Sequence, residues 1–222
     1  MAEVQLAKNR AKIAELRRKC RQIEEGHVLD TAVAYGEAHS LEHRRVKDEN
    51  NRLFPKLLRD HGVAERPVLV IDDDLHPPLG TTRAVLAAIP DTPRVVCVNY
   101  DATKCENMRR LCGDSKVVSV VCADALKYVT SSNSSDLSNF GGFYFDLCGH
   151  VDLSVRALLA VRARRPEGSY IIGITYTTAR DADNQLIAQK LRDATIGYKT
   201  LGGESFLPSQ MHTHFYWVEP KK

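Results

Sequence analysis

Three consecutive carboxylates, residues 72–74, directly follow the apolar run Val68–Ile71. A turn with two prolines and one glycine comes next, and then a segment from residue 81 that can open a helix. An uninterrupted run of β-prone apolar residues is typical of a strand buried on both faces of a parallel sheet. In open α/β sheets, ligands bind beyond the carboxyl end of such a strand, where the next helix presents its N-terminal N–H groups. This stretch therefore predicts a nucleotide-type cofactor site at residues 72–82.

Polar residues also end three later apolar runs. Asn99, Asp124 and Asp146 each stand at or just beyond the end of a β-prone segment. A carboxylate at the position of Asp146 is a candidate general base, and His150 nearby is a candidate proton shuttle. Strand-end aspartates also commonly cap the following helix, and for Asp124 and Asp146 this structural role stays open.

Strand and helix signals alternate from residue 67 onwards. Strands are predicted at residues 68–71, 94–98, 117–122, 142–145 and 169–176, and helices at residues 81–89, 102–112, 125–129, 151–164 and 181–194. Asp101 is predicted to cap the second of these helices. Two β segments, near residues 198–206 and 212–218, follow with no clear helix between them. Alternating βα units predict an α/β fold with a doubly wound, mainly parallel seven-stranded sheet, and the last two segments predict a C-terminal antiparallel hairpin at one edge.

The first third of the chain predicts an N-terminal helical extension, residues 1–66, before a domain at residues 67–222. Helical patterns cover residues 3–25, a short stretch after residue 30, and residues 39–58. The third of these helices is expected to be broken or kinked at Pro55, because proline removes a backbone donor and clashes with the preceding turn.

Neither the histidines nor the cysteines predict a metal site. His39 and His43 lie four residues apart on one face of a predicted helix, but no third ligand accompanies them. The six cysteines include no Cys-x-x-Cys pair, and Cys97 and Cys122 lie in apolar strand-like runs. Small buried side chains are therefore expected, not disulfides or zinc ligands. Cys148 could act as a nucleophile only beside a base, which the sequence does not indicate.

The composition is that of an ordinary globular protein, with 43% hydrophobic residues in a chain of 222. No run approaches the roughly 18 apolar residues that a membrane-spanning helix needs, and the N-terminus is charged, unlike a signal peptide. We therefore expect an intracellular protein, cytoplasmic or nuclear, without membrane contact.

The positive charge of the chain is unevenly distributed. The formal net charge is +3; residues 1–66 carry 14 Lys and Arg against 11 Asp and Glu, whereas the remaining residues carry 17 of each. Basic helices permit a polyanionic partner, although they are commonly just solvated. Arg44, Arg45 and Lys47 are the candidate contacts to a nucleic-acid substrate.

The order of elements from residue 67 to residue 218 resembles the class I methyltransferase fold, which binds S-adenosylmethionine (SAM). Gly80-Thr81-Thr82 resembles the end of the Gly-Ser-Gly-Thr-Thr turn found in amino-group methyltransferases, although the earlier glycine positions hold other residues here. The resemblance implies that SAM lies across the strand ends, with carboxylates near its ammonium group, Asn99 near its ribose and Asp124 near its adenine. The full set of implied cofactor-binding residues is Asp72, Asp73, Gly80, Thr81, Thr82, Asn99, Tyr100, Asp124, Ala125 and Asp146.

The same resemblance implies a methyl transfer to a nucleic-acid base or another amine, with Asp146 and His150 as the catalytic residues. The segment 143–150 more distantly resembles the catalytic loop of guanine-N2 tRNA methyltransferases. The basic stretch at residues 43–51 precedes the first strand, like the Asn- and Lys-containing helix that borders the cofactor in mRNA cap methyltransferases. This stretch is expected to border the site and contact the substrate.

Three other interpretations remain. The run at residues 68–74 also resembles the opening of a response-regulator receiver domain, whose clustered carboxylates bind Mg²⁺, but no lysine follows the fifth strand. The pair Asp72 and Asp74 resembles the nucleophile motif of haloacid-dehalogenase-type phosphatases, which need a later lysine and a further acidic pair. The loss of most glycines from the first turn also fits a non-catalytic, methyltransferase-like protein that binds nucleic acid or another partner.

Overall fold

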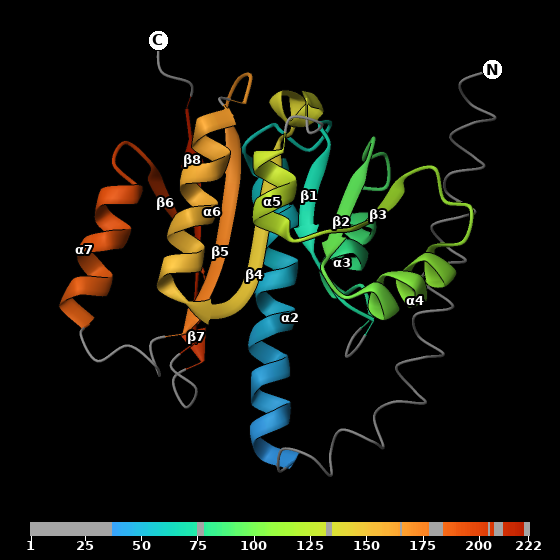
Figure 1. Cartoon of the computed structure of the whole chain (residues 1–222), viewed down its shortest axis with the longest axis horizontal. Helices are drawn as coiled ribbons and strands as arrows, with labels where there is room; N and C mark the ends of the chain where they lie inside the picture. Colours follow the sequence, from blue (N-terminus) through green and yellow to red (C-terminus); the bar gives the residue numbers. More distant parts are fainter. Residues whose placement is uncertain are drawn as a thin grey trace.

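A computed structural model of the chain describes residues 37–74, 78–131, 135–164, 166–177, 184–203, 205–206 and 211–219 (Figure 1). The first two predicted helices lie outside these residues. The side chains of His39, His43, Cys148 and His150 also lie outside the described part of the chain.

The strands form one mixed sheet. In chain order they are β1 (Val68–Ile71), β2 (Val95–Asn99), β3 (Val118–Cys122), β4 (Gly142–His150), β5 (Tyr170–Thr177), β6 (Lys199–Gly202), β7 (Ser205–Phe206) and β8 (Met211–Val218). Their order in the sheet is β3-β2-β1-β4-β5-β8-β6, and β7 also pairs with β8. β1 to β5 pair in parallel, whereas β8 is antiparallel to β5, β6 and β7. The predicted parallel sheet with a C-terminal antiparallel hairpin is confirmed. One arm of the hairpin is interrupted into β6 and β7, so eight strand segments fill the seven predicted positions.

Helices cover both faces of the sheet, as a doubly wound fold requires (Figure 1). One face packs against α2 (Glu37–Asp60), α3 (Gly80–Ala88) and α4 (Ala102–Cys112). The other packs against α5 (Ala125–Thr130), α6 (Val151–Arg164) and α7 (Asn184–Ala194), with the short 3-10 helix η1 (Ser135–Asn139) beside them. None of the described helices is long and apolar enough to cross a membrane.

The central strands are buried on both faces. Side chains alternate along β1, so Val68 and Val70 join the core beneath α2, α3 and α4, while Leu69 joins the core beneath α5 and α6. All three are fully buried. This double burial explains why the strand reads as an unbroken apolar run in the sequence.

Helix α2 shares the core of the sheet although it lies before the predicted boundary at residue 66. The Phe54 ring centroid lies 5.5 Å from that of Tyr144 on β4 and 6.0 Å from that of Phe215 on β8. Gly173 leaves space for this cluster, because a Cβ there would lie 2.4 Å from Cε1 of Phe215. The helix continues through Pro55 to Asp60, so the predicted break at this proline does not occur.

Strand β4 differs from its predicted bounds in a way that matters for the site. The sequence predicts that it ends before Asp146, but the pairing with β5 resumes at Gly149 and His150 after a register shift. The irregularity lies between Asp146 and Gly149. Bulges of this kind redirect side chains at the ends of strands.

Candidate functional site

A cavity of about 330 Å³ opens at the carboxyl ends of β1 to β4. This volume lies at the lower end of the range of roughly 300–1,000 Å³ that is usual for small-molecule sites. Residues from these strand ends, from α2 and from the first turns of the neighbouring helices line it: Lys47, Ile71, Asp72, Asp73, Val98, Asn99, Tyr100, Lys104, Ala123, Asp124, Ala125, Leu126, Asp146, Leu147 and Leu153. The cavity thus brings together most of the predicted cofactor-binding residues, and Gly80, Thr81 and Thr82 lie beside it at the start of α3.

Asp72 holds the first turn of α3 in place. Its Oδ1 accepts a hydrogen bond from the Thr81 backbone N–H at 3.3 Å, and its Oδ2 accepts one from that of Thr82 at 2.7 Å. Burial raises the pKa of Asp72 to about 6, and the hydrogen bonds from Thr82 and the charge of Lys47 offset only part of this rise. Both carboxylate oxygens are therefore engaged at the helix N-terminus, where anionic groups are favoured.

Leu79, the residue before α3, adopts a backbone conformation that usually requires glycine. Leu79 has φ 55° and ψ 41°, the left-handed region, and is the one described non-glycine residue with a positive φ. Its side chain is fully buried, and its N–H donates to the Asp73 carbonyl at 2.9 Å. The left-handed region costs a non-glycine residue about 1–2 kcal/mol. Packing of Leu79 and the cap by Asp72 fix the backbone just before α3, the position of a glycine-rich turn in the methyltransferase family that the chain resembles.

The other two carboxylates of the cluster face α4. Asp73 forms an ion pair with Lys104 at 3.5 Å, and both side chains are about one-third exposed at the cavity. The Asn107 side-chain amide donates to Asp74 at 2.7 Å. Lys104 is not among the predicted site residues, and only its position in the first turn of the helix after β2 could have indicated it.

Asn99 connects the ends of β1 and β2. Its Nδ2 donates to the Asp72 carbonyl at 2.7 Å, and its Oδ1 accepts from the Asp101 N–H at 2.9 Å. Next to it, Tyr100 is 80% exposed at the cavity rim. Asp101 caps α4 by accepting from the Lys104 N–H at 3.0 Å, which confirms the cap predicted from the sequence.

Asp124 combines a capping position with a place in the cavity wall. Its Oδ1 accepts from the Lys127 N–H at 2.8 Å and caps α5. Both Asp124 and the adjacent Ala125 line the cavity. The structural role that the sequence left open for Asp124 is therefore real, and a cofactor contact by the same residue remains a prediction.

An ion pair between α2 and β4 also lines the cavity. Lys47 Nζ is 2.9 Å from Oδ2 of Asp146, whose side chain is only 7% exposed. Of the three predicted substrate-binding residues, Lys47 thus reaches into the cavity, whereas Arg44 and Arg45 do not line it. Arg45 pairs with Glu49 one turn further along α2.

Buried amides dock α2 at this edge of the sheet. Asn50 donates to Thr213 Oγ1 at 3.1 Å, and Thr213 in turn bonds Thr175 at 3.0 Å. Asn51 Oδ1 accepts from the Thr81 hydroxyl at 2.9 Å. Residues three and four positions apart lie on one face of a helix, so these two amides also position Lys47.

Comparisons with known proteins identify the fold. No protein-family profile and no curated protein sequence matches the chain. Among solved structures, a proposed methyltransferase from Thermobifida fusca superposes with a TM-score of 0.55 at 15% identity, covering 84% of this chain and 83% of that one. A proposed O-methyltransferase from Klebsiella pneumoniae gives 0.53 at 13% identity, covering 87% and 95%. A chain of a fibrillarin/Nop5p complex gives 0.54 at 12% identity, covering 70% and 73%.

The chain has the class I, Rossmann-like methyltransferase fold, as the sequence predicted. The strand order also distinguishes it from a receiver domain, whose strands follow the order 2-1-3-4-5. Among the described residues, no group of three or more His, Cys, Asp or Glu side chains could hold a metal ion.

Proposed function

We propose that the protein transfers a methyl group from SAM to an amine, with a nucleic-acid base as the first candidate acceptor. The observation that supports this most strongly is the cavity at the ends of β1 to β4, where polar residues from several strand ends meet. In open α/β sheets this edge is the ligand-binding edge. The class I methyltransferase fold also supports a cofactor site at this edge of the sheet.

The donor set of the cavity fits SAM better than a phosphate-bearing cofactor. Asp73, at the cavity and about one-third exposed, would meet the ammonium group of SAM, because both oxygens of Asp72 are already occupied by α3. Asn99 would lie at the ribose, and Asp124 with Ala125 at the adenine, against the apolar wall that Val98 and Leu126 form. Three carboxylates near the first turn would repel a pyrophosphate.

Bound SAM would supply an activated methyl group, and the residues of this chain would align the acceptor and exclude water. Asp146 would accept a hydrogen bond from the acceptor amine and keep its lone pair directed at the methyl group. The Lys47 ammonium, 2.9 Å from Asp146, stands where such an amine would bind. We infer that an amine acceptor displaces Lys47 from Asp146, and that His150 helps to carry away the proton released on methylation.

Calorimetry with SAM and S-adenosylhomocysteine tests the cofactor assignment. We expect binding to both, and at least about tenfold weaker binding to D73N, since a charge-assisted hydrogen bond contributes about 1.5–3 kcal/mol. D114N removes an exposed carboxylate outside the cavity and should bind like the wild type. No heat with either ligand at millimolar concentration would contradict the assignment and favour a non-catalytic binding protein.

Transfer of labelled methyl groups tests the acceptor. RNA, DNA and small amines are offered separately, and D146N should lose about 100-fold or more in turnover while still binding S-adenosylhomocysteine.

Binding of nucleic acid by the basic face of α2 is tested by salt dependence. Replacing Arg44 and Arg45 should reduce the slope of log K against log salt by nearly one unit for each phosphate that these side chains neutralise. An unchanged slope would count against nucleic acid as the partner of α2.

The alternative function is a non-catalytic module with the same fold. The residues before α3 favour this alternative. Leu79 is buried there and Asp72 is bound to the N-terminus of α3, whereas the methyltransferases that the chain resembles have an open glycine-rich loop. Binding of nucleic acid without any binding of SAM would identify this alternative.

A further inference from the structure

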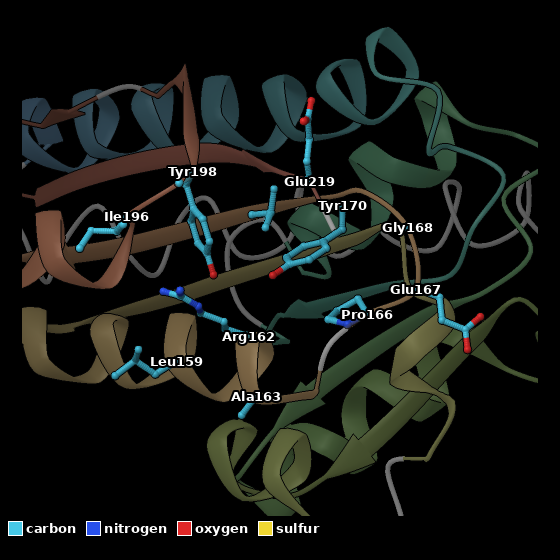
Figure 2. Close-up of a pocket in the computed structure, with 12 residues that line it drawn as sticks. Leu159, Arg162, Ala163, Pro166, Glu167, Gly168, Tyr170, Ile196, Tyr198 and Glu219 are labelled. Atoms are coloured by element: carbon cyan, nitrogen blue, oxygen red, sulfur yellow. The ribbon is translucent and has the colours of Figure 1, made fainter. Parts of the chain in front are cut away.

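A second and larger cavity lies at the opposite edge of the sheet from the candidate site. Its volume is about 1,030 Å³, and it opens between the end of α6, the start of β5, the turn after α7 and the end of β8 (Figure 2). The candidate site lies where β1 to β4 end, whereas β5 begins at this second cavity. The two cavities share no described lining residue, so the second is a separate feature of the molecule.

Three polar side chains from separate segments converge in this cavity. Arg162 of α6, Tyr170 of β5 and Tyr198, just before β6, point towards one another (Figure 2). The Tyr198 hydroxyl is buried and makes no hydrogen bond of regular geometry to any described residue. The two tyrosine hydroxyls face each other, and their interaction affects the pKa of both groups, although its geometry is not that of a regular hydrogen bond. Because buried hydroxyls favour a well-aligned hydrogen-bond partner, a ligand that accepts from Tyr198 would gain from this contact.

Arg162 is the cation of this cavity among the described lining residues. Arg162 makes no ion pair or hydrogen bond within the described part of the chain, although its charge acts on both tyrosines. The acidic side chains at the rim are engaged elsewhere and point away from it (Figure 2): Glu219 accepts from Trp217 Nε1 at 3.2 Å, and Glu167 interacts with Arg66. Burial raises the pKa of both tyrosines, so both are hydrogen-bond donors at neutral pH.

The mouth of the cavity is apolar. Leu159 is 47% exposed and Ile196 is 65% exposed, and both line the cavity. Pro166 and Val218 extend this surface inwards. Isolated apolar side chains on a surface need no explanation, but here they surround a cavity that also holds a cation and two hydroxyl donors.

We propose that this cavity binds a small amphipathic carboxylate, distinct from any methyl donor or acceptor at the other edge. The carboxylate pairs with the Arg162 guanidinium, whose planar fork of N–H groups matches its two oxygens, and it accepts from the hydroxyls of Tyr170 and Tyr198. The aliphatic or aromatic body of the ligand lies against Leu159 and Ile196. Because this site is separate from the strand-end cavity, the proposal does not depend on the proposed methyl transfer.

Calorimetry with three probes of equal chain length tests the proposal: octanoate, octanol and octylamine. We expect octanoate to bind at least about tenfold more tightly than octanol, and octylamine to bind least, since each tenfold step corresponds to about 1.4 kcal/mol. R162Q should lose about tenfold or more of the octanoate affinity, and Y198F about threefold to tenfold. R156Q, at an exposed arginine of the same helix outside the cavity, is the matched control and should bind like the wild type.

Chemical-shift mapping with octanoate locates the site. The amide signals of Gly168 and Gly197, which line the cavity, should shift, while that of Asn99 at the other edge should not. The proposal is overturned if octanoate fails to bind at millimolar concentration, if octanol binds equally well, or if the shifts fall at Asn99. Equal octanoate affinity in folded R162Q and Y198F would overturn it too, and the near-isosteric Y198F keeps the test decisive should R162Q fail to fold.

Discussion

Asp72 should make the stability of the fold depend on pH in a direction opposite to that of an ordinary surface aspartate. Its pKa is raised from 3.8 to about 6, chiefly by burial. The folded state therefore binds the proton more tightly than the unfolded state does. The favourable contribution of the neutral carboxyl group is complete below pH 4 and is lost as the pH rises through about 6. Because one pKa unit corresponds to 1.36 kcal/mol, the loss is about 3 kcal/mol.

Substituting Asp72 by Asn isolates this contribution. Asn retains the shape but offers one acceptor oxygen, so one of the N–H groups of Thr81 and Thr82 loses its partner at a cost of about 1–3 kcal/mol. That cost is independent of pH, whereas the contribution of the Asp72 charge is not. The free energy of unfolding of wild type minus that of D72N should therefore fall by about 3 kcal/mol between pH 3 and pH 7.

Urea denaturation of both proteins at closely spaced pH values measures this difference. All other titrating groups are common to both proteins and cancel if the variant keeps the fold. A difference that stays constant across the range would refute the reasoning. A difference that grows with pH would show that the two N–H donors and the N-terminus of α3 outweigh burial and lower the pKa.

Three further predictions concern packing and electrostatics. K47M leaves the nearly buried Asp146 without this cation and should lower the free energy of unfolding, measured by urea denaturation, by about 1–3 kcal/mol. The loss is smaller than for a fully buried ion pair because the Lys47 side chain is 29% exposed. G173A would press a methyl group against the Phe215 ring and should cost about 1–3 kcal/mol, seen as a lowered Tm. D101A removes the N-cap of α4 and should cost about 1 kcal/mol by urea denaturation, and an unchanged midpoint would contradict the capping role.

The sequence predicts most strands and helices of the fold because the signals for them lie in short stretches of the chain. Apolar runs place β1, β2, β3 and β5 to within one or two residues, since double burial leaves few polar positions in strands such as β1 and β2. The cap at Asp101 is equally visible, because it depends on residues three positions apart. The two late β segments without an intervening helix identify the antiparallel hairpin.

The features that the sequence does not predict depend on contacts between distant parts of the chain. The extension of β4 beyond Asp146 is imposed by pairing with Tyr176 and Thr177 of β5. From the sequence, Lys47 is expected to contact nucleic acid at the surface. No nearby residue indicates that it forms an ion pair with Asp146 on β4. Leu79 adopts the left-handed backbone conformation, which leucine rarely adopts, and its complete burial offsets the cost of that conformation.

Helix α2 links the core of the fold to the candidate site. Phe54 fills the core, and one to two turns earlier on the same helix Asn50 and Lys47 reach the polar edge of the sheet. Spacings of four and three residues keep all three on one face, so any rotation or slip that moved Phe54 out of its aromatic cluster would also withdraw Lys47 from Asp146. The hydrophobic burial of α2 therefore helps to fix the position of the Lys47 cation. It follows that the charge balance of the cavity depends on the packing of the whole fold. The proposed acceptor would have to displace the Lys47 side chain from a helix that is anchored in the core.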